Sequence, residues 1–313
     1  MEASNHLMAK KLYGGIEAGG TKFVCAVGTG PENIVSETRF PTTTPAETIQ
    51  EVCDFFTPYV SQLQGIGLGT FGPIDLDPAS ATYGFITTTP KPNWSNINIL
   101  GMLHEKLSLP IQMDTDVASA GLGESKWGAS KGIDSSLYLT IGTGIGGSYT
   151  YKGKPLRGLV SSEMGHIRIP HDLELDSFHG NCPYHQDCFE GLASGPAIQS
   201  RFGQRAETLP ADHPFWDIEA GYIAYALANF IFTFTPRKII LGGGIMQQDF
   251  LFGKIRAHVR KLLNKYLNHA ILLGEMHEYI VPPALGNRSG VLGAIVLIMD
   301  SLKLEKMKFS EEE

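Results

Sequence analysis

Two cysteines and two histidines stand at a spacing typical of metal ligands. His166 is followed after fifteen residues by Cys182, and Cys182, His185 and Cys188 are then separated by two residues each. Two imidazoles and two thiolates form the ligand set of a closed tetrahedral zinc site, and the short spacing lets a tight loop fold around one ion. Because four protein ligands leave no open coordination position, the sequence predicts a structural zinc and not a catalytic one.

The spacing alone leaves alternatives open. The stretch could be a polar loop with two ordinary free cysteines, and His171 and His179 are spare candidates for a ligand position. We favour the set above because neither spare histidine falls in the compact Cys-x-x-His-x-x-Cys run. A loop of this composition has little apolar surface to bury, so a metal would supply its internal staple.

Glu163 lies three residues before His166, in the run Glu-x-Gly-His. A zinc ligand fixes the backbone around it, and a carboxylate held in this way is suited to accept hydrogen bonds from neighbouring hydroxyls of a sugar. The alternative is an exposed loop acid, which is the commoner state of a lone glutamate. The sequence therefore makes Glu163 a candidate sugar ligand.

Two glycine-rich turns each separate a pair of short apolar runs. Gly19, Gly20, Thr21 and Lys22 lie between the runs 12–16 and 23–27, and the turn 142–147 lies between the runs 136–141 and 148–151. Glycines let amide groups approach a ligand closely, although either turn alone is also typical of a plain hairpin. The turn at Gly19 to Lys22 does not have Walker A spacing. The repeat of strand, turn and strand predicts two similar domains, each with a turn that holds phosphate.

Three further stretches follow predicted strands or open helices. Gly242 to Gly244, with Ile245 and Met246, come after the buried run 238–241 and permit close approach of a nucleotide, or else form a tight strand-to-helix turn. Pro196 opens a helix. Gly72 ends the strand 65–71, and strand ends in α/β sheets bind ligands. In the loop 87–94, Asn93 and Trp94 are suited to contact a sugar, or the loop is a linker with a packing tryptophan.

Asp116 begins a stretch of small residues that predicts a helix through Lys126, directly after a short strand over 111–113. An aspartate at that place is either the helix N-cap or a general base aimed by the strand. Asp114 competes for the role of base, but we expect it to end the strand and form a turn. Hydrophobic periodicity predicts further helices over 45–63, 97–107, 218–234, 250–267 and 290–302, with a third strand of the first meander over 34–40.

Composition narrows the function further. A chain of 313 residues with 42% hydrophobic content is long enough for two domains. The net charge of -7, without a run of lysine or arginine, argues against nucleic acid as the main partner. No apolar stretch reaches transmembrane length, and the first eleven residues lack the apolar region of a secretory signal and predict a disordered leader. Cys25 and Cys53 lie in apolar patterns and are expected to be buried free thiols, so we expect a cytoplasmic protein.

Together these residues resemble the ROK family of sugar kinases, in particular its zinc-containing bacterial fructokinase branch. The resemblance covers nearly the whole chain, from Gly14 to Leu302. Thr115 replaces the family's usual asparagine before the catalytic aspartate, and Ser119 stands where asparagine is frequent. The motifs that carry the resemblance are Gly19-Gly20-Thr21-Lys22, Asp116 with its helix, Gly142-Thr143-Gly144, Glu163-Met164-Gly165-His166, the Cys182/His185/Cys188 run and Gly242-Gly243-Gly244.

The resemblance implies an actin/hexokinase-like (ribonuclease H-like) α/β fold with two domains and duplicated β-meander units. The smaller domain would comprise residues 1–118 joined by a C-terminal helix over 288–304. The larger would comprise residues 119–287 and contain the zinc-stapled loop 166–188. The two domains would close around ATP and sugar, and the chain would form a homodimer.

The implied activity is that of an ATP-dependent hexose kinase, in this branch a fructokinase that converts D-fructose and ATP to D-fructose 6-phosphate and ADP. Asp116 would accept the proton of the attacking primary hydroxyl, and Mg²⁺ would be held mainly by phosphates and water. The sugar would be bound by Glu163, Gly72 and Asn93. Phosphates would lie at Gly19, Gly20, Thr21, Lys22, Thr143 and Gly144, and adenosine at Pro196, Gly242, Gly243, Gly244, Ile245 and Met246.

Two alternatives remain at this level. The first keeps the fold and changes the sugar to mannose or glucose, which the sequence does not distinguish. The second is a sugar-binding regulator without kinase activity, which the presence of Asp116 disfavours. The family's transcriptional repressors carry an N-terminal helix-turn-helix, and here the first predicted strand begins within a dozen residues.

Overall fold

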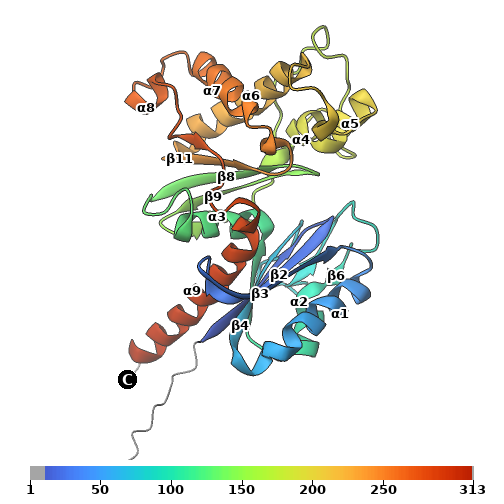
Figure 1. Cartoon of the computed structure of the whole chain (residues 1–313), viewed down its shortest axis with the longest axis vertical. Coiled ribbons are helices and arrows are strands. Elements are labelled where there is room, and N and C mark those ends of the chain that lie inside the picture. The colour runs from blue at the N-terminus through green and yellow to red at the C-terminus, as the bar shows by residue number, and fades with distance from the viewer. Residues whose placement is uncertain (1–10, 312–313) are drawn as a thin grey trace, which may run out of the picture. The chain divides into compact units, whose positions relative to one another are not determined.

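The computed structural model describes residues 11–311, so most of the predicted leader lies outside the described residues (Figure 1). The chain divides into two compact units. Unit 1 extends to Gly123 and resumes at Gly290, and unit 2 comprises Glu124–Ser289. Each unit contains its own mixed sheet.

The sheet of unit 1 has the strand order β3-β2-β1-β4-β7. The first three strands form an antiparallel meander, and β4 and β7 continue the sheet parallel to β1. The strands are β1 Leu12–Ala18, β2 Lys22–Gly30, β3 Asn33–Pro41, β4 Leu63–Thr70 and β7 Ile111–Thr115, with a separate short hairpin of β5 Phe85–Ile86 and β6 Ile97–Asn98.

Helices cover both faces of this sheet. Successive residues of a strand point to opposite faces, and a β-carbon at Gly14 would meet Phe56 of α1 (Pro45–Phe56), whereas one at Gly15 would meet Val291 of α9 (Ser289–Glu311). At Gly67 a β-carbon would overlap the backbone of Ala294, so the strand glycines allow α9 to lie directly on the sheet. The remaining helices that begin in this unit are α2 Ile99–Leu107, α3 Asp116–Trp127 and the 3₁₀ segment η1 Thr57–Gln62.

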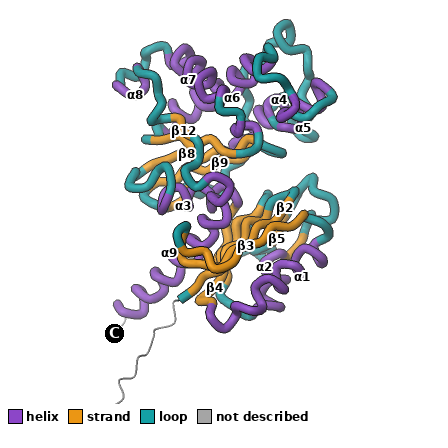
Figure 2. The backbone as a smooth tube through the Cα atoms, in the orientation of Figure 1, coloured by secondary structure: helices purple, strands orange, loops and turns teal. Residues whose placement is uncertain are grey.

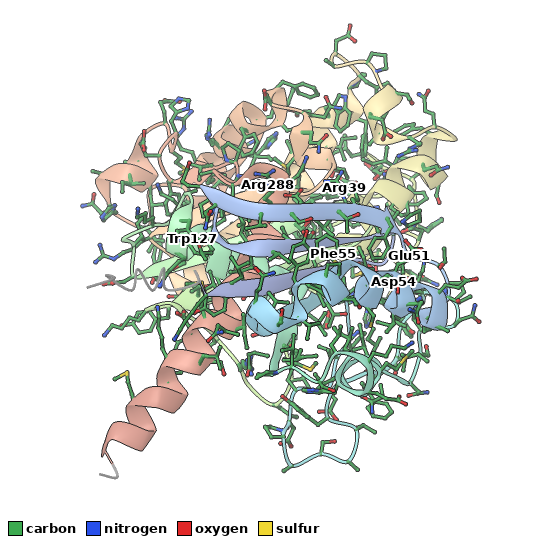
Figure 3. The ribbon with its side chains drawn as sticks, turned by 60° about the horizontal axis from the view of Figure 1, so that its bottom comes forward. Arg39, Glu51, Asp54, Phe55, Trp127 and Arg288 are labelled. Carbon is green, nitrogen blue, oxygen red and sulfur yellow. The ribbon has the colours of Figure 1, made fainter. Side chains whose placement is uncertain are left out.

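Helix α1 is shorter than the helix predicted over 45–63. It begins with a capping box between Thr44 and Glu47, and it gives way at Thr57 to η1. Pro58 lacks the amide hydrogen that another α-helical turn would need, which explains the early end. Figure 3 shows Glu51 and Asp54 on the exposed side of α1.

The sheet of unit 2 repeats the arrangement of unit 1. Its order is β10-β9-β8-β11-β12, with two antiparallel pairs followed by two parallel pairs. Figure 2 shows β8, β9 and β12 of this sheet in orange. This duplication, predicted from the two strand–turn–strand patterns, is confirmed. The strands are β8 Ser135–Ile141, β9 Ile145–Tyr151, β10 Lys154–Pro155, β11 Lys238–Gly242 and β12 Ile280–Val281.

The core of unit 2 forms around α6, Phe215–Phe234, which is apolar on nearly all sides and correspondingly buried. Helix α7, Phe250–Leu263, ends four residues before its predicted limit because Asn264 adopts a left-handed conformation. The other elements are α4 Phe189–Ala193, α5 Gly195–Phe202, α8 Ala270–Leu273 and the 3₁₀ segments η2 Met164–His166, η3 Ala206–Thr208, η4 Ile245–Gln247 and η5 Gly286–Arg288. Within residues 11–311, no helix combines the length and apolar character needed to cross a membrane.

Two buried glutamates of unit 2 have opposite environments. The carboxylate of Glu124 accepts hydrogen bonds from three backbone amides and from the hydroxyl of Ser289. Neither carboxyl oxygen of Glu219 has a hydrogen-bond partner among the described residues. Burial raises the pKa of Glu219 well above its usual value, with the charge of Arg201 opposing and that of Asp176 adding to this effect.

We therefore expect the unfolding free energy to decrease less with rising pH in Glu219→Gln than in the parent chain. The raised pKa keeps Glu219 protonated in the folded chain, whereas the unfolded chain loses that proton above its ordinary pKa. Stability is thus lost as pH rises toward the folded pKa, at up to about 1.4 kcal/mol per pH unit. Denaturant unfolding at pH 5, 6.5 and 8 measures the difference, with exposed Glu51→Gln as the control. Parallel pH profiles for Glu219→Gln and the parent would contradict the expectation.

Candidate metal centre and active site

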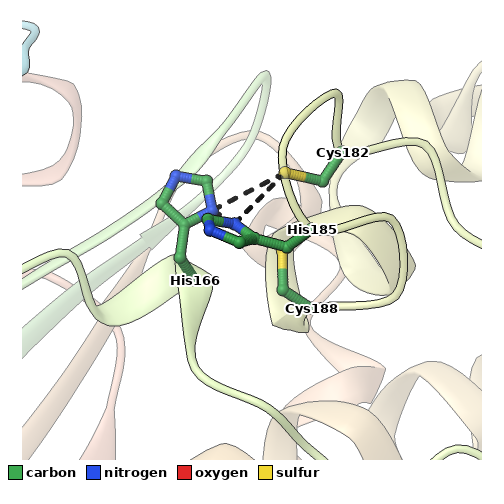
Figure 4. Close-up of side chains that lie close together, drawn as sticks. All are labelled: His166, Cys182, His185 and Cys188. Atoms are coloured by element: carbon green, nitrogen blue, oxygen red, sulfur yellow. Dashed lines mark hydrogen bonds between the residues drawn. The ribbon is translucent and has the colours of Figure 1, made fainter.

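The four predicted metal ligands lie together in unit 2 (Figure 4). One ligand atom from each lies within 4.8 Å of those of the others. The Nδ1 atom of His166 is 3.5 Å from the sulfur of Cys188 and 3.8 Å from that of Cys182, which is 3.7 Å from Nδ1 of His185. The edges of a tetrahedron around zinc with sulfur and nitrogen ligands are about 3.6 Å long. The donor set and its spacing therefore fit a zinc ion.

The backbone of the loop brings these side chains together. Cys182 and Gln186 exchange backbone hydrogen bonds, and the amide of Asn181 donates to the carbonyl of Gly191. A β-carbon at Gly180 or Gly191 would overlap the carbonyl oxygen of Gln186, and Gly180 has a positive φ of 85°. Only glycine fits both requirements at position 180, so the tight turn depends on it.

The two thiols are buried, with Cys182 4% and Cys188 0% exposed. Burial raises the pKa of the Cys188 thiol to about 11, and the neighbouring Cys182 adds to the shift. A divalent cation favours the thiolate and would offset this cost. The predicted buried state of the free thiols Cys25 and Cys53 is also confirmed.

The spare histidines do not join the cluster, which among residues 11–311 contains only the four ligands above. The Nε2 atom of His171 lies 3.0 Å from the carbonyl oxygen of Asp176, and its Nδ1 lies 3.8 Å from the carboxylate of Asp187. The alternative ligand sets considered for His171 and His179 are therefore not supported by the geometry.

Glu163 is exposed and immediately precedes η2, and its carbonyl accepts a hydrogen bond from the amide of the predicted metal ligand His166 at 3.0 Å. Partial desolvation, and to a lesser degree the charge of Glu190, raise the pKa of Glu163. Sequence reasoning missed Glu190, whose carboxylate accepts from the amide of Ile145 at 2.8 Å. Its position two residues after Cys188, in the first turn of α4, was the available signal. Glu190 thus ties the end of the metal loop to the Gly-rich turn.

In unit 1 the parallel strands β1, β4 and β7 end at the same edge of the sheet, where Ala18 pairs with Thr70 and Thr70 with Thr115. The turn 19–21, Gly72 and Asp116 follow these three strand ends. Asp116 is the first residue of α3, and the hydroxyl of Thr115 accepts from the amide of Ala118 as a cap would. The N-cap function therefore belongs to Thr115.

One expectation about this edge is wrong. Asp114 does not end its strand in a turn, because β7 continues to Thr115 and Asp114 is buried within it. For Trp94, the structure supports the second of the two alternatives, a packing tryptophan. It is fully buried against Phe23 and Phe71, and its Nε1 donates to the carbonyl of Thr43 at 2.9 Å. Asn93 beside it is exposed, with a positive φ of 68°.

Three glycine-containing segments converge at the carboxyl ends of β8 and β11 in unit 2. The amide of Gly195 donates to the carbonyl of Gly142 at 2.7 Å, and a β-carbon at Gly142 would lie 3.5 Å from the nitrogen of Gly244. Gly243 has a φ of 92° and no room for a β-carbon beside Ile141. Pro196 and the turn containing Thr143 and Gly144 therefore lie near the segment 242–244. Ile245 and Met246 are themselves buried, with 3% and 4% of their surface exposed.

These features define a protein of two α/β units with a duplicated sheet and a Cys/His cluster in the second unit. The chain belongs to the ROK family, whose model matches residues 13–301. It is 48% identical to a putative fructokinase of Bacillus subtilis, over 94% of this chain and 97% of that protein. It is 44% identical to a fructokinase of Pediococcus pentosaceus, over 93% and 99%.

Solved structures give the same result for the fold. The structure of a ROK hexokinase from Thermus thermophilus matches with a TM-score of 0.75 and 25% identity, over 93% of this chain and 99% of that one. The predicted actin/hexokinase-like α/β fold is therefore confirmed, as is membership of the family inferred from the motifs.

Proposed function

We propose that the chain is an ATP-dependent fructokinase, which transfers the γ-phosphate of MgATP to the primary hydroxyl of D-fructose at C6. The observation that carries this assignment is the high identity to fructokinases over nearly their full length. The products are D-fructose 6-phosphate and ADP. The strand-end positions of Asp116 and of the glycine turns support the same activity.

Asp116 is the proposed general base. Its carboxylate accepts the proton of the sugar hydroxyl as the oxygen attacks the γ-phosphorus in line, so the nucleophile gains charge while the bond to ADP breaks. The hydroxyl of Thr115 accepts from the amide of Ala118, so the Asp116 carboxylate, which accepts from the amide of Val117 at 2.8 Å, shares the start of α3 with a second acceptor, and this supports its role as base. Mg²⁺, bound mainly by phosphate oxygens and water, would neutralise charge on the transferred group.

The glycine turns are the proposed phosphate sites, at Gly19 to Lys22 in unit 1 and at Thr143 and Gly144 in unit 2. Backbone amides in such turns stabilise phosphate charge without rearranging during the reaction. Pro196 and the segment 242–246 form the proposed adenosine site, which their convergence with Gly142 supports.

Glu163, Gly72 and Asn93 are the proposed sugar ligands. The backbone hydrogen bond between Glu163 and His166 supports the view that the metal sets the position of the Glu163 carboxylate. Zinc, bound by four protein ligands, then has a structural role. The homodimer implied by the family resemblance and the cytoplasmic location expected from the free thiols stay predictions.

Gly20→Ala tests the phosphate site in unit 1. A β-carbon at Gly20 meets no atom within 4 Å, so the fold should accept the methyl group. The methyl would occupy space needed by a phosphate, and we expect the KM for ATP to rise roughly tenfold, with little change in thermal midpoint. Gly253→Ala in α7, where a β-carbon also meets nothing within 4 Å, is the control. An unchanged KM for ATP would contradict the assignment of this turn as a phosphate site.

A coupled assay of ADP release with MgATP tests the function, with fructose, mannose and glucose as acceptors and the zinc content measured on the same sample. We expect turnover on fructose to exceed that on the other sugars clearly, with about one zinc per chain. Faster turnover on glucose or mannose than on fructose would support the kinase activity but contradict fructose as the preferred substrate. Absence of turnover on every hexose would support a sugar-binding regulator.

A further inference from the structure

One threonine binds two of the carbonyl groups of the turn after β1, residues 19–21. The hydroxyl of Thr42 donates to the carbonyl oxygen of Gly19 at 2.6 Å, and its amide donates to that of Thr21 at 3.0 Å. Thr42 follows β3, lies 23 residues beyond Gly19 and is 7% exposed. All of these residues belong to unit 1.

Fixing a carbonyl also fixes the next amide. In a trans peptide the C=O of one residue and the N–H of the following residue point in opposite directions. The hydroxyl of Thr42 therefore turns the amide of Gly20 away from itself. Around Gly20 there is no atom within 4 Å of a β-carbon position, so a ligand can approach on this residue's open side. The orientation of the Gly19–Gly20 peptide is the property that phosphate binding at this turn would need.

Thr42 is itself held by the loop 87–96. The ammonium group of Lys91 donates to the carbonyl oxygen of Thr42 at 3.1 Å. The indole of Trp94 donates to the next carbonyl, that of Thr43, at 2.9 Å. Lys91 and Trp94 stand on either side of Asn93, a proposed sugar ligand. Hydrogen bonds thus connect the loop 87–96, here called the sugar loop, with the turn at Gly19 through Thr42.

We propose that Thr42 is a positioning residue for phosphate binding, and that Lys91 and Trp94 couple the sugar loop to it. The proposal rests on the phosphate role of the turn 19–21 stated above. Ordering of the loop by fructose then steadies the Thr42 segment and strengthens nucleotide binding. Because such coupling is reciprocal, bound nucleotide strengthens fructose binding by the same factor.

Thr42→Val tests the positioning role because valine keeps the shape and the backbone amide of threonine but removes the hydroxyl. We expect the KM for ATP to rise roughly tenfold, the KM for fructose to change by less than about threefold, and Thr42→Ser to restore the parent values. Thr57→Val is the matched control, since its hydroxyl donates to the carbonyl of Cys53 at 2.7 Å in the same unit. That variant should keep both KM values.

Lys91→Met tests the coupling. Calorimetry with a non-hydrolysable ATP analogue and Mg²⁺, with and without fructose, should show tighter nucleotide binding with fructose in the parent and in Thr57→Val. The increase in nucleotide affinity that fructose causes should be at least about twofold smaller in Lys91→Met and in Thr42→Val. In the double variant, this increase should be no smaller than in the more affected single variant. Equal enhancement in all variants would refute the coupling.

Comparison with Gly20→Ala separates this proposal from the function on which it rests. If Gly20→Ala raises the KM for ATP and Thr42→Val does not, the positioning role is refuted while the phosphate site stands. If neither substitution changes the KM for ATP, the turn is not the phosphate site and both assignments fall. If both raise it and serine at position 42 restores it, the positioning role is supported.

Discussion

Asp116→Asn is expected to lower kcat with fructose and MgATP by about 10²–10⁴-fold, the usual contribution of a positioned general base. Asparagine has nearly the same shape, but its amide cannot accept the proton of the attacking hydroxyl. Helix α3 should persist because the hydroxyl of Thr115, one residue earlier, accepts from the amide of Ala118. Fructose affinity should therefore stay within about threefold of the parent, since the substitution removes an interaction needed mainly in the transition state.

Asp54→Asn is the control for this experiment. Asp54 lies in the same unit, on the exposed side of α1 (Figure 3), and its carboxylate accepts from the side chain of Gln50 at 2.7 Å. An asparagine oxygen can accept the same hydrogen bond, so both turnover and thermal midpoint should be unchanged. The coupled assay gives kcat, and calorimetry with fructose gives the affinity. Normal turnover by Asp116→Asn would exclude Asp116 as the base.

The features that the sequence predicted well are those encoded within short stretches of chain. The three ligands of the Cys-x-x-His-x-x-Cys run are brought together by one turn, so their spacing alone indicated their proximity. The two strand–turn–strand units are also local, and the structure repeats them with the same directions. Asp116 follows a strand directly, which was enough to place it at the start of α3.

The features that the sequence did not reveal depend on partners far along the chain. The sequence shows an aromatic residue at position 94 but not whether it is buried. The burial of Trp94 depends on Phe23 and Phe71, which lie elsewhere in the same unit. Thr42 has unremarkable neighbours in sequence, and although Glu190 lies two residues after Cys188, the contacts of these residues with Gly19 and Ile145 appear only in the structure. Long-range hydrogen bonds of this kind have no sequence period to detect.

Substitution of a predicted metal ligand should strongly reduce both the zinc content and the thermal stability of the chain. We expect Cys182→Ser to reduce bound zinc from about one per chain to nearly none, because a neutral hydroxyl replaces a thiolate. Zinc at a hundred times its Kd stabilises the folded chain by about 2.7 kcal/mol, so its loss should lower the thermal midpoint by about 4 °C. Metal analysis after gel filtration and a thermal scan measure both. The buried thiol Cys53, which lies outside the cluster, provides the control Cys53→Ala, and that variant should retain its zinc.

Removal of the metal should also affect the two substrates differently. The amide of His166 donates to the carbonyl of Glu163, so a relaxed metal loop would displace the proposed sugar ligand. The turn at Gly19 and Thr42 lie in unit 1, which contains none of the four ligands. In unit 2 the turn with Thr143 and Gly144 is held at Ile145 by Glu190, which belongs to helix α4 and not to the loop itself. A chelated sample should therefore show a KM for fructose raised several-fold, about 1 kcal/mol in binding, with a much smaller change for ATP, and zinc should restore it. Equal effects on both KM values, or an increase confined to ATP, would mean that the metal does not act through Glu163.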